Sequence, residues 1–401
     1  MLRRTLLGAV AGGLAAPYVA RAAGAMPGVT KDSIKIGQTM PYSGPASAYG
    51  VIGQTEAAHF KMLNAQGGIK GRKIEFLSAD DGYSPPRTVE ETRRLVESEG
   101  VAFMYQGLGT PTQSAVQRYL NQKKVPQVFV NSGAEKWADP EHFPWTIGWQ
   151  PSYRIEAAIY ARHLMQVNPA AKLCVLFQND DFGKDYLTGL HDGFGPKYDA
   201  IVVKAVSYEV SDPTVDSQIV TLKGSGADAL LTVATPKFAA QAIKKVAEIS
   251  WRPAQHYLTN VSNSTAAVMI PAGAANGTGI ISGSYLKDQS DPQWANDPGM
   301  NQLRGWIKQW APDADIANGS TVFGYANALS LHKVLEQCGE DLSRENIMYQ
   351  ATNLRDLESP VLLPGIRIGT SPKDFHPIKQ LQLAKWSGSA WQLFGDVLSG
   401  V

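Results

Sequence analysis

The stretch MYQGLGTPTQSAV, residues 104–116, passes from an apolar strand pattern through two glycines into a helical pattern. Strand, short loop and helix in this order form the repeating unit of α/β proteins. The same unit recurs around it: apolar, β-branched runs at 33–40, 73–80, 101–107 and 126–132 alternate with helical patterns at 53–66, 86–99 and 112–122. The first third of the chain therefore predicts a parallel sheet covered by helices.

The rhythm restarts after residue 150. Strand patterns lie at 172–180, 200–209, 228–235 and 255–260, and helical patterns at 152–167, 184–193, 214–223 and 236–249. Two rounds of alternation predict two doubly wound α/β domains with parallel sheets.

The last third is too poor in strands to form a third domain. A further segment at 277–288 precedes helical patterns at 298–310 and 320–337, and strand patterns close the chain at 363–369, 378–386 and 390–396. We therefore expect the chain to recross and complete each domain in turn. The expected lobes are 30–150 plus 284–358, and 151–283 plus 359–401. Three crossings form a hinge, and a hinged cleft between two α/β domains is typical of a ligand trap.

Composition and the N-terminal residues indicate an exported globular protein. The 401 residues are 44% hydrophobic and 18% charged, and the net charge of +1 gives no reason to expect a nucleic-acid or anionic-membrane partner. Residues 1–22 combine a basic start (MLRR), a short apolar run (TLLGAVAGGLAA) and the small-x-small site Ala20-Arg21-Ala22. This order predicts a signal peptide cleaved near Ala22-Ala23. Both the general and the twin-arginine export routes stay open.

No pattern for catalysis, metal binding or a cofactor is present. The chain has no GxSxG, HExxH or phosphate-loop motif, and its seven histidines are scattered without ligand spacing. One of them, His59, fits a helix surface. Cys174 in a strand pattern and Cys338 near a helix end are expected to be buried free thiols, not a disulfide. We expect a protein that is not an enzyme, has no cofactor and binds no metal; an exported hydrolase is the weaker alternative.

Four segments carry a family resemblance. They are IKIGQTMPYSGPASAYG at 34–50, NAQGGIKGRKIEFLSADDGYSP at 64–85, VPQVF at 125–129 and GTSPKDFHPIKQLQL at 369–383. Together they resemble the periplasmic binding proteins for leucine and related amino acids, which serve ABC importers. The resemblance covers roughly residues 30–400. It implies a type I binding-protein fold with three crossovers, a periplasmic monomer, and an ABC permease with its ATPase subunits as partners.

The glycine-rich loop at 106–113 predicts an anion seat. Ligands of open α/β sheets lie outside the carboxyl ends of the strands. Gly107 and Gly109 would let a ligand approach the backbone, Thr110 would cap the helix and Pro111 would take its first position. The free N–H groups at the helix start would then face an anion, most simply a carboxylate. A plain capped helix is the alternative, and the resemblance favours the carboxylate because family members hold it at this loop.

Two further loops of the first domain complete the expected seat. Asn131, Ser132 and Gly133 follow the next strand end, where similar residues of the family meet the ligand carboxylate. Tyr42 and Tyr49 follow the first strand and would wall the pocket, with simple packing as the alternative for each.

The second domain departs from the family pattern. Phe182 stands where family members commonly have a tyrosine against the ligand. Thr235 replaces a bulky aromatic residue, and Asn260 replaces the acid that usually holds the ligand ammonium. Asp180 or Asp181 would cap a helix or reach the amine instead.

The expected ligand is therefore a small carboxylate whose amine is in doubt. A buried ammonium without a carboxylate partner is costly. Both an amino acid and an organic acid without an amine, aromatic in view of the nearby rings, stay open. The expected function is a solute-binding protein of an ABC importer, with a periplasmic sensor module for a receptor as the alternative.

Overall fold

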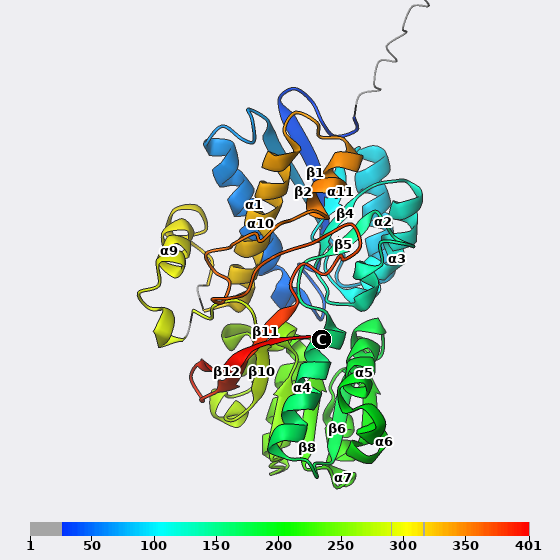
Figure 1. Ribbon diagram of the computed structural model, residues 1–401, viewed down its shortest axis with the longest axis vertical. Coiled ribbons are helices and arrows are strands. Elements are labelled where there is room, and N and C mark those ends of the chain that lie inside the picture. Colours follow the sequence, from blue (N-terminus) through cyan, green and yellow to red (C-terminus); the bar gives the residue numbers. More distant parts are fainter. Residues whose placement is uncertain (1–25, 290, 316, 401) are drawn as a thin grey trace, which may run out of the picture.

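The computed structural model describes residues 26–289, 291–315 and 317–400 and shows two lobes, one above the other in Figure 1. The predicted signal peptide at 1–22, with its cleavage site near Ala22-Ala23, lies outside the described residues.

The first lobe is built on a five-stranded sheet in which all strands are parallel, in the order β2-β1-β3-β4-β5. The helices α1 (Val51–Ala65) and α10 (Gly319–Cys338) pack together on one side of it, and α2 (Pro85–Arg93) and α3 (Thr110–Gln122) on the other (Figure 1). The strands are β1 (Ser33–Met40), β2 (Lys73–Asp80), β3 (Phe103–Tyr105), β4 (Gln127–Val130) and β5 (Thr146–Gly148).

The second lobe is built on a seven-stranded sheet in the order β12-β11-β10-β9-β8-β6-β7. The five strands from β10 to β7 in this order are parallel, and the C-terminal strands β11 and β12 join them at the opposite edge through antiparallel pairing. The strands are β6 (Leu173–Gln178), β7 (Val202–Tyr208), β8 (Ala229–Val233), β9 (Gln255–Leu258), β10 (Ile281–Ser284), β11 (Gln380–Trp386) and β12 (Trp391–Ser399). The covering helices are α4 (Tyr153–Val167), α5 (Asp181–Phe194), α6 (Tyr198–Ile201), α7 (Asp216–Gly224) and α8 (Pro236–Glu248).

The chain passes between the lobes three times. It leaves the first sheet after β5 and returns after β10 through α9 (Pro298–Trp310), α10 and α11 (Arg344–Ala351). It then reaches the second sheet again at β11. The predicted class, two doubly wound parallel-sheet domains joined by a three-crossover hinge, is confirmed. The lobe boundaries at 150/151, 283/284 and 358/359 stay a prediction.

Each sheet buries apolar side chains under its helices. In the first lobe Leu95, Val101, Met104, Val116 and Leu120 form a core beneath α2 and α3. A second cluster lies between the other sheet and α7 and α8, and it contains the free thiol of Cys174 in β6; Cys338, at the end of α10, is also free and buried. Among the described helices none has the length and apolarity needed to cross a membrane.

Two sequence predictions about strands and burial are wrong. The segment 363–369 is not a strand: Gly365 has a φ of +86°, and only Ile368 forms an isolated bridge, with Leu357. The second concerns His59, which is fully buried instead of lying on a helix surface, because α9 brings Trp306 against it.

Candidate functional site

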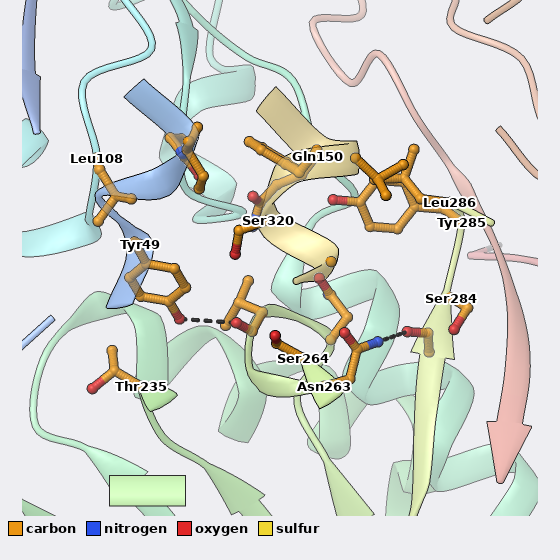
Figure 2. Close-up of a pocket in the computed structure, with 18 of the residues that line it drawn as sticks. Tyr49, Leu108, Gln150, Thr235, Asn263, Ser264, Ser284, Tyr285, Leu286 and Ser320 are labelled. Carbon is orange, nitrogen blue, oxygen red and sulfur yellow. Dashed lines mark hydrogen bonds between the residues drawn. The ribbon is translucent and has the colours of Figure 1, made fainter. Parts of the chain in front are cut away.

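The carboxyl ends of the strands of both sheets border one cavity of about 110 Å³. The first lobe contributes Tyr49, Leu108 and Gln150, and the second contributes Thr235, Ser264 and Ser284 (Figure 2). Ser320, at the start of α10, also reaches the cavity. This position outside the strand ends is where open α/β sheets bind ligands.

The glycine-rich loop closely follows the cavity wall. Gly109 has a φ of +103° and a ψ of 146°, and a Cβ atom there would lie 2.4 Å from Cε2 of Tyr83. Only glycine fits this conformation and contact. The helix α3 begins one residue earlier than predicted, so Gly109, not Thr110, occupies the N-cap position. The Thr110 hydroxyl instead pairs with the hydroxyl of Ser132 at 2.7 Å.

Asn131 lines the cavity and has a buried hydrogen-bond donor without a partner among the described residues. Its main chain is fixed, since its N–H donates to Gly107 O at 2.9 Å and its carbonyl accepts from Gly109 N at 3.1 Å. The side chain lines the cavity and is 8% exposed. Its Nδ2 atom is buried and has no hydrogen-bond partner among the described residues. A buried, unpaired N–H costs about 1–3 kcal/mol, so this group favours an acceptor from a ligand.

The donor lies in a favourable field for an anion. Asn131 is paired through its backbone with Leu108, two residues before the start of α3. The N-terminal end of a helix carries a partial positive charge. Gly109, Thr110 and Asn131 all line the cavity, so the three predicted residues that the structure brings together here can hold a carboxylate.

The structure places the remaining predicted residues in two groups. Tyr49, Phe182, Thr235 and Asn260 line the cavity together with the residues above. Tyr42, Ser132, Gly133 and Asp181 do not belong to its lining. The Tyr42 hydroxyl instead lies 2.6 Å from Ser78 Oγ, and Asp181 forms an ion pair of 3.2 Å with Lys136. Gly133 accepts the N–H of Tyr153 at 2.8 Å, which explains its place behind the wall.

Aromatic side chains form much of the wall. The lining includes six rings, and the ring of Phe182 lies 4.7 Å from that of Tyr153. Asp180 caps α5 by accepting the Phe182 N–H at 2.9 Å, as one of its two predicted roles required. The six aromatic residues that line the cavity are Tyr49, Tyr83, Tyr153, Phe182, Tyr285 and Phe323.

Hydrogen bonds join the two lobes at residues that line the cavity. The Tyr49 hydroxyl of the first lobe donates to the carbonyl of Val261 in the second at 2.9 Å (Figure 2). The Gln178 amide donates to the Tyr83 hydroxyl at 3.3 Å and adds a second bond across the interface. The two lobes therefore meet through specific contacts at the cavity.

Sequence reasoning missed Glu156, which lies behind Asn260. It is fully buried in α4, and burial raises its pKa to about 7. Its carboxylate accepts from the main-chain N–H of Asn260 at 2.8 Å and from Nδ2 of the same residue. The sequence offered one signal for Glu156: it is an acid on a helix face that is otherwise apolar, with Tyr153 and Tyr160 one turn away.

Two charged residues at the second crossover were also missed. Lys287 and Asp288 follow β10 and border the cavity. The Lys287 ammonium lies 2.9 Å from both carboxylate oxygens of Asp297 and 5.3 Å from the ring centre of Trp294. Its charge is therefore balanced within the protein. The described residues contain no cluster of three or more His, Cys, Asp or Glu side chains that could hold a metal ion.

Comparison with known proteins agrees with this geometry. Residues 33–390 match the family described as "Periplasmic binding protein". An amino acid binding protein from Pseudomonas aeruginosa is 24% identical over 208 residues, which are 49% of this chain and only about half, 52%, of that relative.

Two solved structures share the fold. A branched-chain amino acid ABC transporter protein from Thermus thermophilus with bound valine superposes with a TM-score of 0.81 at 12% identity, covering 92% of this chain and 97% of that one. A solute-binding protein from R. palustris in complex with 4-hydroxybenzoate superposes with a TM-score of 0.75 at 19% identity, covering 92% of this chain and 97% of that one. At these identities the likeness shows the fold alone. Since the family match spans nearly the whole described chain, the protein belongs to the periplasmic binding protein family, type I.

Proposed function

We propose that this protein is the solute-binding protein of an ABC importer, which traps a small carboxylate between its lobes and delivers it to the permease. The observation that carries the proposal is the unpaired Nδ2 donor of Asn131 beside the N-terminal end of α3. A carboxylate would satisfy this donor and gain from the helix dipole. The protein would act in the periplasm as a monomer without a cofactor, with the permease and its ATPase subunits as partners.

The ligand class follows from the walls. Six aromatic rings border the cavity, and Asn260 offers a neutral group where an amino-acid binder would need an acid. An aromatic carboxylic acid matches both features, and a branched-chain or other amino acid is the alternative. The two structural neighbours, one with 4-hydroxybenzoate and one with valine, show that this fold accommodates both classes.

A thermal-shift screen on protein refolded free of carried-over ligand tests the proposal. The panel pairs benzoate with benzamide, 3-phenylpropionate with phenylalanine, and 4-methylpentanoate with leucine. A ligand that binds only the folded state at 100 times its Kd stabilises it by about 2.7 kcal/mol. We expect aromatic acids to raise Tm and benzamide, which has the shape of benzoate without its charge, to have little effect. If no carboxylate raises Tm, or benzamide equals benzoate, the proposal is wrong.

A further inference from the structure

The side-chain amide of Asn260 is held in one orientation. Asn260 follows β9, lines the cavity and is 7% exposed. Its Nδ2 atom donates to Oε2 of Glu156, and its main-chain N–H donates to Oε1 at 2.8 Å. The nitrogen and oxygen of an amide lie on opposite sides of the same carbon. With Nδ2 turned to the carboxylate, Oδ1 lies on the side of the amide away from Glu156 and is the acceptor that Asn260 can offer a ligand.

Glu156 cannot contact a ligand in the cavity directly. It is fully buried, is not part of the cavity lining, and also accepts the Tyr160 hydroxyl at 2.5 Å. The same hydroxyl accepts the N–H of Gly283, a cavity residue, at 2.6 Å. Above the Glu156 pKa of about 7 the carboxylate only accepts hydrogen bonds, so there a flipped amide would set oxygen against oxygen. Glu156 is therefore a positioning residue that acts through Asn260.

We infer that Glu156 and Asn260 select a carboxylate ligand that carries a neutral hydroxyl group, which donates to Oδ1 of Asn260. This inference rests on the proposed function, because the first lobe must hold the carboxylate. A ligand without the donor would leave Oδ1 desolvated and unpaired. A ligand ammonium would also be a donor, but it would lose its hydration against a neutral oxygen, while the carboxyl group of Glu156 already accepts three hydrogen bonds within the protein.

Calorimetry with acids that differ by one group tests the inference. The pairs are benzoate with 4-hydroxybenzoate, and 3-phenylpropionate with 2-hydroxy-3-phenylpropionate; phenylalanine is the amine analogue of the second pair. We expect the wild type to bind the hydroxylated member of at least one pair about tenfold tighter or better. In Glu156→Gln and in Asn260→Ala this ratio should fall towards one, while the acid without the hydroxyl keeps its affinity.

Glu56→Gln is the matched control. Glu56 is likewise a fully buried helix carboxylate, but it lies in α1, accepts from Gln38 at 2.6 Å and is absent from the cavity lining. This variant should keep the wild-type ratio. Asn260→Ala leaves Glu156 with the main-chain N–H and Tyr160, so it decides the matter if Glu156→Gln does not fold.

The possible failures can be told apart. If none of the acids binds, the proposed function is wrong and the inference falls with it. If the acids bind and neither pair shows a preference for the hydroxyl, or both variants keep that preference, the function stands and the inference is overturned. Tighter binding of phenylalanine than of its hydroxy analogue would also overturn it, because the site would then recognise charge.

Discussion

The sharpest prediction concerns the substitution Asn131→Leu. Leucine has nearly the shape of asparagine but no polar atom, so the change removes the donor without opening a hole. In the ligand-free protein Nδ2 is buried without a partner among the described residues. Its loss should therefore leave the free energy of unfolding unchanged or raise it, because replacing an unsatisfied group relieves a cost of about 1–3 kcal/mol.

Ligand binding should respond in the opposite direction. If Nδ2 donates to a carboxylate, the lost bond is one to a charged group, worth about 1.5–3 kcal/mol. At about 1.4 kcal/mol for each factor of ten, the affinity should fall roughly 10- to 150-fold. A separation of this kind, with stability kept and affinity lost, distinguishes a ligand contact from a structural one.

Calorimetry and thermal melts of two variants measure both quantities. Asn263→Leu is the matched control, since Asn263 lines the same cavity but its Nδ2 already donates to Gly283 O at 3.2 Å. That variant should lose stability, because it removes a hydrogen bond that the folded protein makes. If Asn131→Leu binds the acid that shifts Tm most with wild-type affinity, or melts as low as Asn263→Leu, the carboxylate seat has been placed at the wrong residue.

Three other substitutions probe the loop, the lobe contact and the buried histidine. Gly109→Ala should lower stability by about 1–3 kcal/mol through backbone strain and should also weaken binding, because the new methyl would meet the Tyr83 ring; a wild-type Tm would contradict this. Tyr49→Phe should weaken acid binding roughly two- to tenfold by removing the bond to Val261, and small-angle scattering should show a more open ligand-free protein. Burial, followed by the charge of His332, lowers the pKa of His59 from 6.5 to about 3, so the unfolded chain binds the proton first and stability is lost as pH falls from 6.5 towards 3. His59→Leu should therefore flatten the fall of Tm between pH 7 and pH 5, and an unchanged slope would show that another group dominates, such as His256, which is also buried and whose pKa burial also lowers.

Local sequence was sufficient wherever an element carries its own signals. Strand β1 coincides with the predicted run at 33–40, and α9 with the pattern at 298–310, where Asp297 caps the helix and Pro298 begins it. The segment 363–369 shows the limit of such signals. Its Ile366 and Ile368 are buried and alternate with the exposed Arg367 as in a strand, but the segment forms a connection over the first lobe (Figure 1). Alternation reports burial, and pairing with a neighbour strand needs information from elsewhere in the chain.

The candidate site divides in the same way. The loop at Gly109 was readable because its glycines, helix start and strand end are adjacent in sequence. The role of Glu156 was not readable, since its partner Asn260 lies 104 residues away and meets it only when α4 packs beside the end of β9. Asn260 was recognised as an unusual residue, yet its orientation depends on a carboxylate that local sequence does not connect with it. Long-range packing, not residue type, decides which end of the amide faces a ligand.

The two lobes thus bring opposite polar groups to one cavity. The first contributes the Asn131 donor and the N-terminal end of α3, and the second contributes the oxygen of Asn260. A ligand can shift the balance between open and closed forms only by its differential affinity for them. A carboxylate without a further polar group can satisfy the first lobe in either form. A hydroxy acid would bond to both lobes at once, which only the closed form permits, and would add to the bond between Tyr49 and Val261. Selection of the ligand and closure of the hinge would then depend on the same hydrogen bond.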